Sequence, residues 1–178
     1  FAALGYEIAW LRLLFLAFAI NTHYEFSIIL IAFLLGIALG SFICSRFLDA
    51  RRDLLALFGG MEILIGLMGI ASILLFVSMT ELVGFVRSSS EWWKHRAGVF
   101  AVAFAIMLLP TLLMGAIFPL VGRMNTRRLS LLGRGIGDVY AVNSVGAIGG
   151  AFATGFLLIP ALGTVGTFQF LGALNLIV

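Results

Sequence analysis

The sequence predicts an all-α protein, a polytopic transmembrane bundle of about six helices. Of its 178 residues, 62% are hydrophobic and only 11% are charged, and the mean hydropathy is +1.18. Soluble domains carry about a quarter charged residues, and disordered chains show the opposite bias. Apolar runs of about 20 residues, the length of a helix that crosses the hydrocarbon layer, recur along the whole chain. These observations exclude a soluble globular domain.

Six apolar segments are separated by short polar stretches: 2–20, 26–48, 54–79, 97–121, 139–158 and 164–178. Each is expected to be a helix, because lipid offers no partner to the backbone groups of an open strand. We treat residues 1–178 as one transmembrane domain. Because the sequence lacks an initial Met and ends within an apolar run, we expect a piece of a longer protein with an incomplete last helix.

The first three segments differ in their charges. Segment 2–20 contains Glu7 and Arg12 and has no basic region before it, which is not the pattern of a signal peptide. Segment 26–48 is apolar on all faces and ends at a charged loop. Segment 54–79 carries one carboxylate, Glu62. An ionisable group at mid-membrane is costly, so each is expected to face a partner or a polar cavity.

The region before the fourth segment is of mixed polarity and ends in Trp92-Trp93-Lys94-His95-Arg96. Indole rings and basic groups favour the boundary of water and lipid, so we expect a short surface helix leading into this cluster. Within segment 97–121, Pro110 and Pro119 each remove a backbone hydrogen bond and are expected to bend the helix.

The fifth segment is the richest in glycine, and the stretch 160–163 closes it before the sixth begins near Thr164. Small residues four apart let two helices approach closely. The sequence has such pairs in its second and fifth segments, and we expect helix packing there: Gly36 and Gly40, then Gly146 and Gly150, continued by Ala151 and Gly155. A ligand groove along these glycines is the alternative.

Basic residues predict the orientation, because they gather in cytoplasmic loops. One side holds Arg46, Arg51, Arg52, Arg123, Arg127, Arg128 and Arg134, and the other holds Arg87, Lys94 and Arg96. We therefore expect a cytoplasmic amino end in a bacterial inner membrane. The net charge of +3 is too small and scattered to indicate nucleic-acid binding.

Glu7 and Arg12 lie five residues apart, about 140° around a helix, and are not expected to pair with each other. We predict instead that Arg12 reaches a carboxylate on another helix, with Glu62 as the leading candidate. Such a pair would fix helix register or line a substrate path. Tyr6, Tyr140 and Asn143 are polar groups that could join it.

The sequence offers no catalytic, cofactor-binding or metal-ligating set. No cluster of His, Cys, Asp and Glu has ligand spacing, and no Ser/His/Asp or Cys/His set can be assembled. Cys44 lies in an apolar run as a small hydrophobic residue, and His23 and His95 are expected to be solvated. The glycine-rich run 133–137 lacks the full dinucleotide pattern and reads as a basic loop.

Four motifs in order resemble the membrane-bound spermidine-synthase-like family: GYEIAWLR (5–12), AFLLGIALGS (32–41), PTLLMGAIFP (110–119) and YAVNSVGA (140–147). That family joins a helical membrane part, similar to major facilitator transporters, to a cytosolic aminopropyltransferase domain. The stretch 49–52 is similar to a transporter loop motif but lacks its glycine. The resemblance implies an anchor, or half of a transporter for small polyamine-like solutes. An aminopropyltransferase domain, if present, would lie beyond Val178, so whether the protein is an enzyme stays open.

The alternative is an accessory subunit of a larger respiratory or photosynthetic membrane complex, packed through its glycine faces. Both hypotheses imply contact with the lipid bilayer and with other subunits or a second helical half. Aromatic residues, 13% of the chain, suit contact with lipid, pigment or neighbouring helices without choosing among them.

Overall fold

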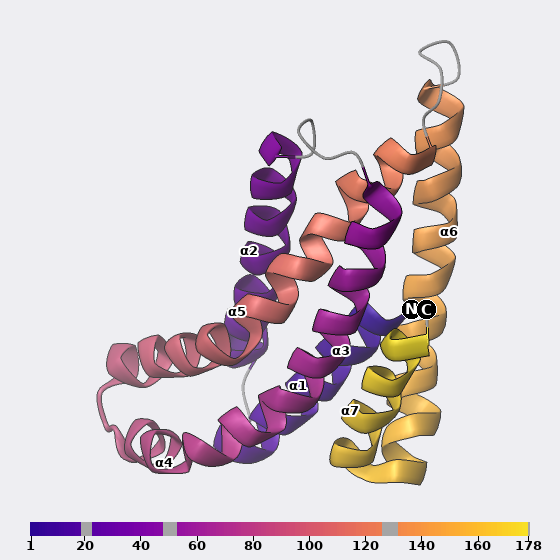
Figure 1. Cartoon of the computed structure of the whole chain (residues 1–178). Helices are drawn as coiled ribbons and strands as arrows, with labels where there is room; N and C mark the ends of the chain where they lie inside the picture. The colour runs from indigo at the N-terminus through magenta and orange to yellow at the C-terminus, as the bar shows by residue number, and fades with distance from the viewer. Residues whose placement is uncertain (19–22, 48–52, 126–131, 178) are drawn as a thin grey trace.

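The computed structural model describes residues 1–18, 23–47, 53–125 and 132–177 and confirms the predicted all-α fold. The helices are α1 (Ala2–Phe18), α2 (His23–Phe47), α3 (Leu54–Ser78), α4 (Thr80–Ser88), α5 (Trp92–Asn125), α6 (Leu132–Ala153) and α7 (Ile159–Ile177). A short π-helix, η3 (Thr154–Leu158), joins α6 to α7. Figure 1 shows α2 and α5 on one side of the bundle, α6 and α7 on the other, and α3 between them.

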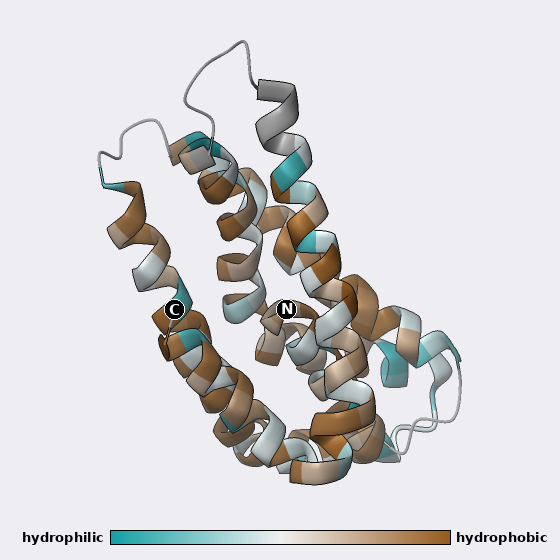
Figure 2. Ribbon diagram, turned by 90° about the vertical axis from the view of Figure 1, so that its right-hand side faces the viewer, coloured by the Kyte–Doolittle hydropathy of each residue, from teal (hydrophilic) through white to brown (hydrophobic). Residues whose placement is uncertain are grey.

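Within these residues, four helical stretches are long and apolar enough to cross a membrane: His23–Phe47, Leu54–Ser78, Trp92–Met124 and Gly137–Ile177. The last includes both α6 and α7. The described part of α1, Ala2–Phe18, has 17 residues and is not one of these four stretches. Over the residues that the structure describes, all six predicted apolar segments are thus helical, and four stretches are long candidate spans. Figure 2 shows hydrophobic residues along most of the helix lengths.

Helix α4 is the short helix expected before the tryptophan cluster. It follows α3 after the single residue Met79, and Val83 and Val86 on its inner face are buried. Val86 packs against Gly98 of α5, and its backbone oxygen lies 3.1 Å from His95 Nδ1. The outer face of α4 stays exposed, so the helix lies along the end of the bundle (Figure 1).

Helices α2 and α5 pack along their lengths through glycine. A Cβ atom built on Gly36 would lie 1.8 Å from Thr111 Oγ1, and one on Gly40 would lie 1.9 Å from the backbone oxygen of Leu112. Helix α5 stays continuous through Pro110 and Pro119 and changes direction along its length (Figure 1). The glycine face of α2 therefore packs closely against the curved helix α5, and at Gly40 the two backbones are in contact.

The start of α1 lies on the glycine face of α6. A Cβ on Gly150 would come within 2.1 Å of the backbone oxygen of Phe1, and one on Gly146 within 3.1 Å of its nitrogen. Gly155, in η3, lies 4.0 Å from the Ile8 side chain by the same measure. Helices α3 and α7 also cross at glycines, with a Cβ on Gly66 only 2.8 Å from the Gly172 oxygen.

Helix α7 reverses direction near its start, at Gly163, whose backbone has φ 69° and ψ 176° and is not helical. This combination belongs almost only to glycine. The reversal brings Phe168 onto α1, where its ring packs with Tyr6 and Trp10 at centroid distances of 5.9 Å. All three side chains are fully buried. They form the aromatic cluster at the centre of the bundle.

Candidate membrane cavity

A cavity of about 840 Å³ opens among α1, α3, α5, α6 and α7. Its polar lining residues are Glu62 on α3, Asp138 and Asn143 on α6, and Asn175 on α7. Its apolar lining is Phe1, Ala2, Ala3, Phe58, Ile65, Met114, Ile117, Phe118, Val121, Met124, Val139, Val142 and Gly146. Five helices, from the first to the last of the chain's order, therefore build one chamber.

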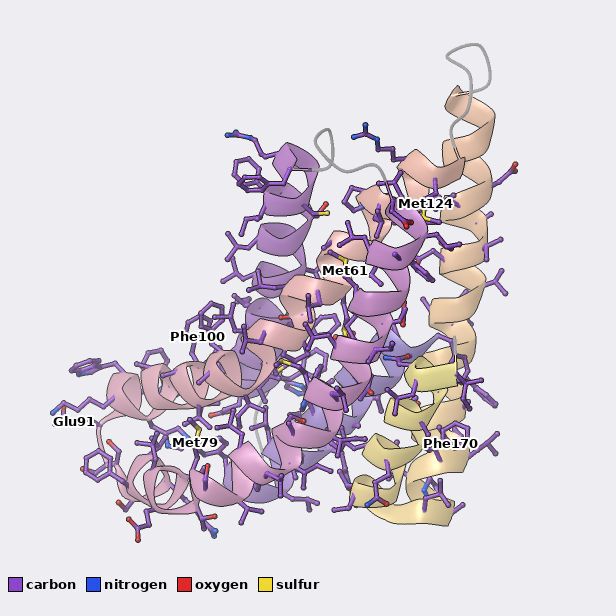
Figure 3. All side chains as sticks on the ribbon, in the orientation of Figure 1. Met61, Met79, Glu91, Phe100, Met124 and Phe170 are labelled. Carbon is purple, nitrogen blue, oxygen red and sulfur yellow. The ribbon has the colours of Figure 1, made fainter. Side chains whose placement is uncertain are left out.

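The cavity lies toward the end of the bundle at which α5 finishes and α6 begins. Met124, near that end of α5, is a lining residue, and Figure 3 shows it at the opposite end of the bundle from Glu91. The lining reaches from Asp138 down to Gly146 on α6, a span of about 12 Å at 1.5 Å per residue. The chamber thus extends from the helix ends into the membrane layer.

Its charged lining residues, within the described part of the chain, are both acidic. Glu62 is half-buried, whereas Asp138 is exposed toward the mouth. Asn143 is exposed to the cavity, and Asn175 is 3% exposed. Carboxylate and amide oxygens accept hydrogen bonds, and phenyl rings at Phe58 and Phe118 offer faces that attract cations. The arrangement can hold a small cation that carries hydrogen-bond donors.

Two of the sequence candidates, Glu62 and Asn143, meet in this cavity. Glu7 is 8% exposed on α1 and is not among the lining residues. Arg12 is exposed on the outside of α1. Tyr140 is exposed on α6, with its ring edge-on to Phe118 at 5.9 Å. The cavity therefore brings together Glu62 and Asn143 and leaves Glu7, Arg12 and Tyr140 outside its lining.

The predicted pair of Arg12 and Glu62 is wrong: the described part of the chain has no ion pair between them. Tyr6 lies against Gly69, and Trp10 Nε1 donates to Ser72 Oγ at 3.1 Å, so α1 and α3 run in the same direction. Arg12 is consequently level with a point about 12 residues beyond Glu62, roughly 18 Å along α3. This register puts the two groups out of reach.

Sequence reasoning missed the ion pair of Arg96 and Glu25, whose charged atoms lie 3.8 Å apart. Their side chains are only 15% and 7% exposed, and the Arg96 guanidinium also lies over the rings of Trp92 (4.0 Å) and Tyr24 (5.3 Å). Glu25 and Arg96 each lie next to the end of a predicted segment, where a charged side chain is ordinarily expected to be solvated. A basic residue among aromatic residues was the available signal.

Asp138 and Asn175 were also missed as cavity residues. Asp138 directly precedes the fifth predicted segment, and Asn175 is one of two amides in the sixth, the other being Gln169. Their approach to Glu62 depends on how α6 and α7 fold back beside α3, which no local pattern encodes. An amide in an otherwise apolar helix was the one hint, since such groups tend to face a partner.

No protein family, curated protein or solved structure matches the chain. The described residues contain no group of three His, Cys, Asp or Glu side chains that could hold a metal ion. The long apolar helices determine the class. The chain is a helical integral membrane protein.

The described basic residues that predict the orientation lie at two opposite ends of the bundle. α2 ends and α3 begins at the same end of the bundle as the junction of α5 and α6 (Figure 1). Arg46 and Arg123 lie at that end, and Arg87, Lys94 and Arg96 lie at the other. Arg51, Arg52, Arg127 and Arg128 fall outside the described residues, as does the side chain of Arg134.

Proposed function

We propose that this chain is a membrane domain that binds a small organic cation, of the polyamine class, in the cavity. The observation that carries the proposal is the lining: two carboxylates, two amides and aromatic rings, with no Lys or Arg among the described lining residues. Like charges would repel a cation from a basic cavity, whereas carboxylates attract it. The volume of about 840 Å³ lies within the range of ligand sites.

The motif resemblance supports the same chemical class. Two of the motif stretches, 5–12 and 140–147, lie on α1 and α6, the helices that pack at the cavity, and the second contains Asn143. A membrane domain that captures a polyamine could present it to an attached aminopropyltransferase or move it across the membrane as one half of a transporter. We place the mouth of the cavity on the cytoplasmic side of a bacterial inner membrane, with the arginine-rich loops.

Binding is the direct test. The purified chain in lipid nanodiscs is titrated with spermidine by calorimetry, alongside a neutral diol of similar length. We expect saturable binding of spermidine, no binding of the diol, and a loss on the order of tenfold in affinity for Glu62→Gln, about 1.4 kcal/mol. Glu81→Gln, on the exposed face of α4, is the matched control and should bind as the parent does. Equal affinity of Glu62→Gln and the parent would refute the proposal.

Transport is tested separately in vesicles that contain the chain. Uptake of radiolabelled spermidine above that of empty vesicles supports the transporter role, and binding without uptake supports the anchor role. Either role leaves the cation site intact. The transporter role differs from the anchor role only in requiring a second helical half or a second copy of the chain to complete a path across the membrane.

The accessory-subunit hypothesis draws on a different observation, the outward face of α6. Val145 and Ile148 are each more than 70% exposed, and Phe152 and Phe156 continue the same apolar surface. A neighbouring subunit could cover this face as well as lipid does. Copurification of the chain in a fixed ratio with other membrane proteins, together with absence of spermidine binding, would favour this role.

A further inference from the structure

A row of polar groups continues from the cavity into the bundle along one face of α3. Positions 62, 66, 69 and 72 are spaced by four, three and three residues, so they share one side of the helix. Glu62 is at the cavity, and Ser72 is buried in the core at 2% exposure. Their separation of ten positions corresponds to about 15 Å along the helix, half the thickness of the hydrocarbon layer.

The two middle positions are glycines, and each faces a polar side chain from another helix. A Cβ on Gly66 would lie 3.2 Å from Asn175 Cβ, and one on Gly69 would lie 2.5 Å from the Tyr6 hydroxyl. Neither Asn175 nor Tyr6 could occupy its place if α3 carried a larger residue there. Every turn of this face therefore presents a hydrogen-bonding group, in the order Glu62, Asn175, Tyr6, Ser72. We call these four residues the polar track.

Two groups of the polar track are buried without a partner among the described residues. They are Asn175 Nδ2, on a side chain 3% exposed that lines the cavity, and the Tyr6 hydroxyl, on a side chain with no exposed surface. Leaving such a group unbonded costs about 1–3 kcal/mol. Buried water normally satisfies groups of this kind.

The far end of the track is closed. Ser72 Oγ donates to the Gly69 oxygen at 2.6 Å and accepts from Trp10 Nε1 at 3.1 Å, so its hydrogen bonds are satisfied within the protein. The Trp10 ring stacks with Tyr6 at 5.4 Å and packs with Phe168 at 5.9 Å. The aromatic cluster therefore fills the bundle where the polar track stops.

We propose that water enters the membrane core from the cavity along the polar track and that the Trp10–Ser72 pair ends this path, leaving it open to one side of the membrane only. The hydrated segment would bring water to the bundle centre, where the aromatic cluster closes the path. The path shares the cavity with the proposed cation site but requires no bound cation.

Cysteine accessibility tests the path, because Cys44 is the only cysteine of the sequence. In a Cys44→Ser background, single cysteines replace Asn175 and Ser72. Leu67→Cys and Leu74→Cys are the depth-matched controls, since both leucines are exposed on the lipid-facing side of α3. The vesicle-bound protein is treated with a membrane-impermeant cationic methanethiosulfonate, without any polyamine. Labelling after unfolding in detergent verifies that every thiol is present.

We expect the thiols at 175 and 72 to react faster than their leucine controls by on the order of tenfold or more, because reactive thiolate forms in water and not in hydrocarbon. Adding Tyr6→Phe, which removes one hydroxyl and keeps the ring, should slow the reaction at 72 and leave that at 175 unchanged. Equal rates at 72 and 74, or no effect of Tyr6→Phe at 72, would overturn the proposal. Since no polyamine is present, failure of spermidine binding leaves this result unaffected.

Discussion

Gly115 of α5 lies directly against the backbone carbonyl of Ile37 of α2. A Cβ atom on Gly115 would stand 2.1 Å from the Ile37 oxygen, well inside van der Waals contact. Gly36 and Gly40 make the reciprocal approach from α2, so both helices expose backbone at the crossing. In lipid, such close packing is a main source of helix association, because there is no hydrophobic effect between helices.

Gly115→Ala should therefore weaken the α2–α5 crossing. The obstacle is backbone rather than a movable side chain, so we expect a loss of about 1–3 kcal/mol in unfolding free energy. Unfolding by denaturing detergent in mixed micelles measures it. Gly60→Ala is the control: a Cβ there meets no described atom within 4 Å, and alanine is the better helix former by about 1 kcal/mol. Equal stability of the two variants would contradict the packing role of Gly115.

The sequence predicted the helices well because the signal for each is local. Apolar runs and polar breaks predicted a helix over 54–79, and α3 extends over Leu54–Ser78. The stretch of mixed polarity before the tryptophan cluster predicted the short helix α4. The π-helix Thr154–Leu158 was not predicted, since it arises where α6 and α1 pack. Segment 2–20 was predicted as a crossing, and α1 is helical over Ala2–Phe18, with positions 19 and 20 outside the described residues.

The site was only partly predictable. The free-energy cost of an ionisable group inside the membrane predicted that Glu62 needs a polar environment, and Glu62 lines the cavity. The same arguments could not choose its neighbours, because the axial register of α1 on α3 decides that Arg12 lies far from it. Asp138 and Asn175 reach the cavity through the Gly163 turn and the packing of α6. The axial register between helices that are far apart in the sequence produces no local pattern, so a single apolar sequence does not predict it.

Breaking the buried ion pair at the opposite end of the bundle should be costly. Glu25→Gln leaves the Arg96 guanidinium without its countercharge at a site with little exposure, and we expect a loss of about 1–3 kcal/mol in unfolding free energy. Glu91→Gln breaks the exposed pair with Lys94 and should change stability by about 0–1 kcal/mol. The same detergent unfolding measures both. Equal losses would show that burial of the Glu25–Arg96 pair carries no weight.

Trp10→Phe isolates the hydrogen bond that ends the polar track. The ring remains aromatic, but the donor to Ser72 Oγ is lost, and we expect destabilisation by about 1–2 kcal/mol from the bond and the smaller ring. Trp93→Phe, at a ring 61% exposed, should leave stability within about 0.5 kcal/mol. Thermal unfolding in detergent, followed by tryptophan fluorescence, compares them. A Trp10→Phe variant as stable as Trp93→Phe would rule out a structural role for this bond.

Gly163 fixes the reversal that carries α7 back along α3. Its φ of 69° with ψ of 176° lies outside the left-handed helical region and belongs almost only to glycine. Gly163→Ala should therefore cost about 1–3 kcal/mol in unfolding free energy, although a Cβ there meets no described atom within 4 Å. The loss would come from backbone strain alone.

Gly163→Asn separates this strain from an ordinary left-handed turn. Asparagine tolerates the left-handed helical region near φ +57° and ψ +47°, but not a ψ close to 180°. We therefore expect Gly163→Asn to be as unstable as Gly163→Ala in the same unfolding measurement. Recovery of parental stability by asparagine would mean that the turn relaxes to the left-handed helical conformation. The position of Asn175 beside Glu62 would then not depend on the observed geometry at Gly163.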